Sequence, residues 1–212
     1  MSAHCSTPAP STDSADPRYR RILWIALTLN LAMFVVELGA GLASGSVSLL
    51  ADAIDFFGDA ANYGVSLAVL AMAQAVRSKA ALLKAACMLG FGLFVLGKAA
   101  WSALAGIAPD GLTMGAVGFL ALCVNVGVAA MLYAYRNGDA NMQSVWLCSR
   151  NDALSNIAVI LAAFGVLGTA SVWPDVIIAS IMGLLAIGSA FVVFKSARKE
   201  LATEGGHAQH HH

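Results

Sequence analysis

Three aspartates lie in an apolar stretch that is long enough to cross a bilayer. Asp52, Asp55 and Asp59 all fall within residues 46–70. A carboxylate near the middle of a membrane costs about 3 kcal/mol on insertion scales, so residues of this kind usually serve a function. On an α-helix the three positions, together with Asn62, fall in one stripe ~80° wide. The stripe predicts a polar, functional face on an otherwise apolar helix.

Within this stripe, Asp55 and Asp59 are four residues apart, so their carboxyl groups project together one helical turn apart. Two such oxygen ligands are half of a divalent-cation site. Three acids on one face repel one another unless a cation or protons neutralise them. The alternative, in which helix ends or hydroxyl groups satisfy a purely structural stripe, leaves that repulsion unbalanced.

Cys148 and Asp152 repeat the four-residue spacing in a later apolar stretch, with Asn151 beside the same face. A carboxylate together with a thiolate suits a borderline transition metal, zinc above all. The sequence therefore predicts a metal site made by Asp55, Asp59, Cys148 and Asp152. Buried cysteine is also common simply as a small apolar residue, and this interpretation of Cys148 stays open.

Further polar residues are candidates for accessory roles at this site: Asp52, Asn62, Asn151 and Glu37. Glu37 lies near the outer end of the first apolar stretch. We expect it to anchor that helix to the second, and the alternative is that it touches an exit path for the cation. Lys98, in the third stretch, is the partner that we expect for Glu37 or Asp52.

The composition is that of a membrane protein. Of 212 residues, 59% are hydrophobic and only 11% are charged, whereas soluble domains have about 25% charged residues. At about 20 residues a span, the length allows six helices with short loops. The formal net charge of zero excludes a basic nucleic-acid-binding protein. We therefore predict an all-α membrane protein with six transmembrane helices, at about 21–43, 47–74, 80–106, 112–135, 143–168 and 174–195.

The regions outside the six spans are short. Residues 1–20 are expected to form a disordered cytoplasmic tail, and residues 21–196 the six-helix transmembrane domain. Residues 197–212 are expected to form a short cytoplasmic tail. Its histidines, His207 and 210–212, either collect metal or are the remnant of an expression tag.

The distribution of Lys and Arg predicts the orientation. The loops around 44–46, 107–111 and 169–173 have none, and the other side collects Arg18, Arg20, Arg21, Arg77, Lys79, Lys84, Arg136, Lys195, Arg198 and Lys199. The positive-inside rule then places both termini in the cytoplasm, with the chain in the plasma membrane, the inner membrane in a bacterium. Asp55, Asp59 and Asp152 come to lie about 12, 18 and 15 Å from the ends of their spans, near the middle of the bilayer.

Two stretches of the chain resemble a known family of metal transporters, the cation diffusion facilitators. They are NLAMFVVELGAGLASGSVSLLADAIDFFGDAAN, beginning at Asn30, and SVWLCSRNDALSNIAVILAA, beginning at Ser144. The resemblance implies a six-helix transmembrane domain, usually dimeric, that exports zinc or related divalent cations from the cytoplasm against protons. It also implies transport ligands at Asp55, Asp59 and positions 148 and 152.

The sequence departs from the family pattern in three respects. Position 148 is cysteine where relatives usually have histidine or aspartate, which puts the metal preference in question. We expect no soluble C-terminal domain after the sixth span, and the loop before the fifth span is short rather than histidine-rich.

The expected function is secondary transport of a divalent transition metal by proton antiport, without an enzymatic activity or a cofactor. Zinc is the first candidate, with cadmium, cobalt and iron as others. The chain lacks a phosphate-binding GxxxxGK[ST] motif, so an ion gradient would have to supply the energy. An intramembrane metalloenzyme is disfavoured because no histidine lies in any predicted span. A membrane scaffold or sensor that binds metal without moving it is the alternative.

Overall fold

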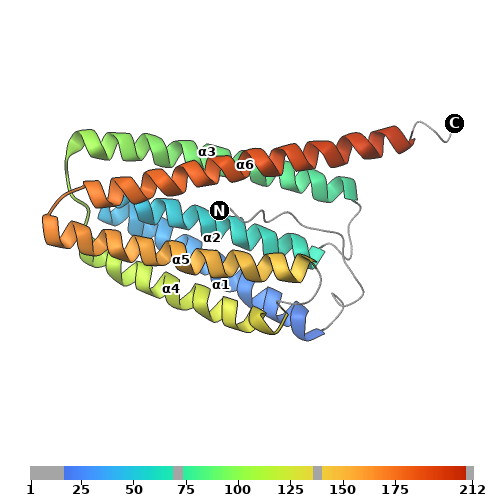
Figure 1. Ribbon diagram of the computed structural model, residues 1–212, viewed down its shortest axis with the longest axis horizontal. Helices are drawn as coiled ribbons and strands as arrows, with labels where there is room; N and C mark the ends of the chain where they lie inside the picture. Colours follow the sequence, from blue (N-terminus) through green and yellow to red (C-terminus); the bar gives the residue numbers. More distant parts are fainter. Residues whose placement is uncertain (1–16, 69–73, 136–139, 209–212) are drawn as a thin grey trace.

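The computed structural model describes residues 17–68, 74–135 and 140–208, with side chains at all of these except 74–78, 80, 81, 84, 135, 140–148, 196 and 199–208. Over these residues the chain forms six α-helices and one short 3-10 helix (Figure 1). They are α1 (Pro17–Ser44), α2 (Val47–Ala68), α3 (Gln74–Ala105), α4 (Gly111–Leu132), η2 (Tyr133–Tyr135), α5 (Ala140–Thr169) and α6 (Trp173–Ala208).

Five of the helices in the described ranges contain a segment long and apolar enough to cross a membrane: Pro17–Ser44, Ala85–Ala105, Gly111–Leu132, Ser149–Thr169 and Trp173–Lys195. The exception is α2, which has 22 residues and so a length of about 33 Å, enough for a ~30 Å hydrocarbon core. Its three aspartates lower its hydropathy. The predicted all-α membrane architecture with six helices is confirmed.

The helices pack as three main pairs, α1 with α2, α4 with α5, and α3 with α6. In Figure 1, α3 and α6 lie together along one edge of the molecule, beside a bundle made by the other four helices. Helix α2 contacts α1, α3, α5 and α6. Because α2 has neighbours on so many sides, it can carry carboxylates without presenting them to lipid.

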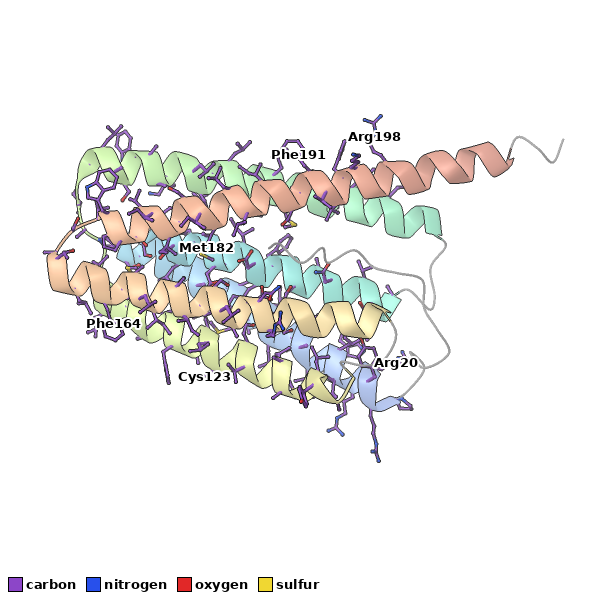
Figure 2. The ribbon with its side chains drawn as sticks, viewed as in Figure 1. Arg20, Cys123, Phe164, Met182, Phe191 and Arg198 are labelled. Atoms are coloured by element: carbon purple, nitrogen blue, oxygen red, sulfur yellow. The ribbon has the colours of Figure 1, made fainter. Side chains whose placement is uncertain are left out.

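Apolar side chains cover the outside of the bundle as well as its interior. Figure 2 shows Phe164 and Phe191 projecting away from the helices, and both are more than half exposed. Met182 belongs to the main hydrophobic core, to which α2, α3, α4, α5 and α6 all contribute. An apolar exterior over a packed apolar core is the pattern of a protein whose solvent is lipid.

Two expected boundaries differ in the structure. Helix α1 begins at Pro17, so residues 17–20 of the expected disordered tail are helical, because proline is well suited to the first turn of a helix. Helix α6 continues to Ala208, well into the expected tail 197–212. Residues 197–202 contain good helix formers and no Gly or Pro, so the helix outlasts its apolar segment. Residues 1–16 lie outside the described ranges.

A buried carboxylate joins the beginning of α6 to the beginning of α2. Asp175 accepts hydrogen bonds from the Ser46 hydroxyl (2.8 Å) and from the backbone amides of Val47 (2.8 Å) and Ser48 (2.9 Å). The first amides of a helix lack intrahelical acceptors, and the positive end of the helix dipole favours an anion there. Gly45 makes the preceding turn with φ = 74°, a conformation that glycine adopts most readily. Asp175 therefore caps a helix from a distant part of the chain.

A candidate cation site between α2 and α5

The predicted site residues lie on two helices that run in opposite directions. Helices α2 and α5 contact each other within the bundle (Figure 1). Asp59 on α2 and Asp152 on α5 interact directly through their carboxyl groups, and the electrostatic interactions of Asp152 extend to Asp55 and Asp52. We call Asp59 and Asp152 the Asp59–Asp152 pair. The structure thus brings together two carboxylates that are far apart in the sequence.

Two hydroxyl groups connect the helices beside this pair. The Tyr63 hydroxyl donates a hydrogen bond to Oδ2 of Asp59 (3.3 Å), and it is also hydrogen-bonded to the hydroxyl of Ser149 (2.7 Å). Both Tyr63 and Ser149 are fully buried. Since Tyr63 is on α2 and Ser149 on α5, this chain of hydrogen bonds fixes the two helices next to the carboxylates.

Sequence reasoning did not identify Tyr63 or Ser149. Tyr63 lies one turn after Asp59, at the edge of the same helical stripe, so a search of that stripe for hydroxyl groups as well as acids would have found it. Ser149 has no comparable signal. Its role depends on which residue of α2 it faces.

The four predicted metal ligands are described to different extents. Asp55 is half-buried and interacts electrostatically with Asp52 and Asp59. One carboxyl oxygen of Asp152, Oδ2, is buried without a hydrogen-bond partner. Cys148 belongs to α5, but its side chain lies outside the described ones. Among the described side chains, no three of the His, Cys, Asp and Glu type are grouped so as to hold a metal ion. The four-residue ligand set stays a prediction.

The amide side chains near the pair occupy different environments. Asn62 is partly buried on α2, and Asn151 accepts a hydrogen bond from Arg150 (3.4 Å), whose side chain is exposed. Asn156, which sequence reasoning did not identify, is fully buried on α5, and neither atom of its amide has a hydrogen-bond partner. It lies one turn beyond Asp152 on the same helical face.

The other two accessory candidates, Glu37 and Asp52, form a second pair of interacting carboxyl groups between α1 and α2. Neither of them accepts a hydrogen bond from Lys98 or any other described donor, so the expected partnership with Lys98 is wrong. The reason is one of packing: α3, which carries Lys98, packs mainly on α6, whereas this pair lies between α1 and α2. We call these residues the Glu37–Asp52 pair.

The chain is similar to known cation efflux proteins. Residues 23–202 match the family model described as the cation efflux transmembrane domain. The metal cation efflux system protein CzcD of Cupriavidus metallidurans is 25% identical over 189 residues, which cover 84% of this chain and 60% of that protein. The cation efflux system protein CzcD of an Alcaligenes species shows the same identity and coverage.

The chain therefore spans about 60% of the length of these curated relatives. The family match covers most of the chain; it includes at least the greater part of each of the six helices, and it includes both carboxylate pairs. The resemblance expected from the motifs around Asp59 and Asp152 is thereby confirmed, and the chain belongs to the cation efflux family, the cation diffusion facilitators.

Proposed function

We propose that this multi-pass membrane protein is a secondary transporter that exports a divalent transition-metal cation from the cytoplasm. Zinc is the first candidate for its substrate, followed by cadmium, cobalt and iron. The observation that carries this proposal is the direct interaction of Asp59 with Asp152 inside a bundle of membrane-spanning helices. The names of the relatives, which are metal cation efflux proteins, support the same function.

In this proposal the transported cation binds to Asp55, Asp59, Cys148 and Asp152. Two carboxylates that face each other in an apolar surrounding repel, and a divalent cation removes that repulsion more completely than any neutral ligand. The hydroxyl of Tyr63 and that of Ser149 hold the helices in register, so the pair is positioned before the cation arrives. Oxygen ligands alone would suit hard cations, and the thiolate of Cys148 would shift preference toward zinc.

Protons are the proposed counter-ion. A carboxylate binds either a metal ion or a proton, so exchange of the two at one site is the simplest coupling. Protons would neutralise the acids when the metal leaves, as the apolar surrounding requires.

For the orientation we propose that both termini face the cytoplasm, in the plasma membrane. In Figure 2, Arg20 of α1 and Arg198 of α6 lie toward the same end of the molecule, as the positive-inside rule requires of a cytoplasmic end. The opposite end, which carries the turn between α1 and α2, is then the outer end. Assembly as a homodimer is proposed from the family resemblance.

The test is metal flux into sealed liposomes that contain the purified protein and an enclosed zinc-sensitive dye. We expect zinc to enter with the native protein, and Asp59→Asn and Asp152→Asn to abolish the signal. Asp110→Asn is the matched control, because Asp110 is an exposed aspartate at the start of α4, far in the sequence from both pairs.

The outcomes separate the candidate functions. Zinc flux in Asp152→Asn equal to that of the native protein would refute the assignment of the site. Zinc binding to the native protein without flux would favour a membrane scaffold or sensor.

A further inference from the structure

The Glu37–Asp52 pair is buried more completely than the Asp59–Asp152 pair. Glu37 is 0% exposed and Asp52 is 1% exposed. All four of their carboxyl oxygens are buried, and none accepts a hydrogen bond from any described donor. Buried carboxylates in proteins are normally paired with donors or cations, because each unsatisfied charge is costly. Apart from each other, the two carboxyl groups therefore have no partner among the described residues.

The pair is at a different depth from the Asp59–Asp152 pair. Asp52 precedes Asp59 by seven residues on α2, which is about 10 Å along the helix. Glu37 lies in the last two turns of α1 and Asp52 in the first two turns of α2, so both are close to the outer end. Ligands of one cation lie within 2–3 Å of it. One cation cannot be bound by both pairs at once.

Tight packing of α1 on α2 holds Glu37 against Asp52. Gly41 lies one turn after Glu37, and a Cβ atom at this glycine would come within 2.9 Å of Leu50 Cδ2 and 3.1 Å of the Leu50 backbone nitrogen. Gly41 thus permits a close approach of the helices next to the pair. The close approach of the helices beside the pair keeps the two carboxyl groups near each other.

The interval between the two pairs is also polar. Asp55 lies between Asp52 and Asp59 on α2 and interacts with both. Asn156 lies on α5, one turn closer to the outer end than Asp152, and its buried amide has no hydrogen-bond partner. Polar side chains therefore continue from the Asp59–Asp152 pair toward the Glu37–Asp52 pair.

We propose that Glu37 and Asp52 form a second binding position for the transported divalent cation, between the Asp59–Asp152 pair and the outer end. This inference rests on the proposed transport function. It adds a second position that the cation would occupy before its release at the outer end. The position offers up to four carboxylate oxygens and no thiolate, so it would hold the cation with oxygen atoms alone. Such a ligand set binds soft transition metals less tightly than one with a thiolate, which suits a site from which the cation departs.

The test counts bound Co²⁺ by equilibrium dialysis and elemental analysis of the purified full chain in detergent. All five histidines, His4, His207 and 210–212, and Cys5 lie in the terminal segments, so they are replaced in every protein that is tested. The informative background is Asp59→Asn/Asp152→Asn, which removes the first position. We expect this double variant to retain one bound Co²⁺ per chain and to lose it when Glu37→Gln and Asp52→Asn are added.

Ser66→Ala is the matched control in the same background. Ser66 is another buried residue of α2 whose hydroxyl has no hydrogen-bond partner, and it lies at the other end of the helix. This variant should keep the bound Co²⁺. Helix content and a single species in size-exclusion chromatography show that each variant is folded.

The result that overturns the inference is a folded Asp59→Asn/Asp152→Asn protein that binds no Co²⁺, although the native protein binds it. Retention of the ion after Glu37→Gln and Asp52→Asn would overturn it equally, and would leave the pair as one that shares a proton. A native protein that neither binds nor transports metal would instead refute the proposed function, so the two failures are distinguishable.

Discussion

The hydroxyl of Tyr63 is the group through which the protein controls the position of the Asp59 carboxylate. It donates a hydrogen bond to Asp59 and is hydrogen-bonded to the Ser149 hydroxyl, so it links the carboxylate on α2 to a side chain of α5. A carboxylate held by a fixed donor has fewer orientations available before a cation binds. In the proposed site, Tyr63 would therefore act as a positioning residue rather than as a ligand.

We predict that Tyr63→Phe raises the zinc concentration for half-maximal flux while the maximal rate changes little. The lost hydrogen bond contributes about 1 kcal/mol, which corresponds to roughly fivefold weaker apparent affinity. Flux into liposomes over a range of zinc concentrations measures both quantities. Tyr133→Phe, a change at an exposed tyrosine of η2, should leave both unchanged. A fall in the maximal rate alone would contradict a positioning role.

A second prediction concerns the proposed role of Cys148 in the metal preference. If its thiolate binds the cation, Cys148→Ser should lose cadmium transport first, because soft ligands select soft ions, and Cys148→His should keep zinc transport. Competitive flux of zinc, cadmium, cobalt and manganese measures the ranking. Cys123→Ser, at an exposed cysteine of α4, is the control. An unchanged ranking in Cys148→Ser would assign Cys148 to packing.

At the scale of elements, the junction of α2 and α6 depends on one side chain. Asp175 satisfies two backbone amides and one hydroxyl in a fully buried position. By contrast, Asp110 caps α4 in water: it accepts from the Leu112 amide and the Thr113 hydroxyl, and these bonds lower the pKa of its carboxyl group. The two caps have the same chemistry but differ in burial and in the helix that supplies them.

We predict that Asp175→Ala lowers the free energy of unfolding by about 3 kcal/mol, because buried donors of α2 would lose their acceptor. For a chain of this size that corresponds to a fall in melting temperature of roughly 10 °C. Thermal unfolding in detergent, followed by circular dichroism, measures it. Asp110→Ala should cause a much smaller fall, since water replaces the lost bonds. Equal shifts in the two variants would show that burial of the Asp175 cap is unimportant.

At the scale of the whole molecule, the bundle places both carboxylate pairs along one helix, α2, at different depths. Both pairs involve α2, with α1 opposite one pair and α5 opposite the other. Transport past both pairs would require that each charge be balanced at every step. In the proposed transport cycle, protons that move in the opposite direction would neutralise the emptied sites.

We accordingly predict that an imposed zinc gradient drives protons in the opposite direction. Proteoliposomes with an enclosed pH dye should show acidification or alkalinisation that depends on the sign of the gradient. The response should disappear in Asp59→Asn. If zinc flux is the same with and without a pH gradient and the dye does not respond, the protein conducts zinc passively.

Much of this architecture was predictable because membrane-spanning helices can be recognised in a sequence by their length and hydropathy. The spacing of Asp55 and Asp59, and of Cys148 and Asp152, likewise followed from helical geometry alone. The roles of Asp175 and Ser149 did not, because they depend on which helices meet, and no local pattern encodes that. The prediction that Lys98 is the partner of Glu37 failed for the same reason. Lys98 has a suitable charge and depth, but α3 packs mainly on α6.

The hydrogen bonds of Asp175 also provide a point about which α2 could rotate. It fixes the beginning of α2 to α6, whereas Tyr63 ties a later part of α2 to α5. Asp59 is about 16 Å from this fulcrum along the helix axis, and Asp52 only about 6 Å. A swing of about 10° would then displace Asp59 by about 3 Å and Asp52 by about 1 Å, and the former exceeds a typical metal–oxygen distance. Such a rotation would have to break the hydrogen bond between Tyr63 and Ser149, and it would then pull open the deep pair while it displaced the shallow pair far less.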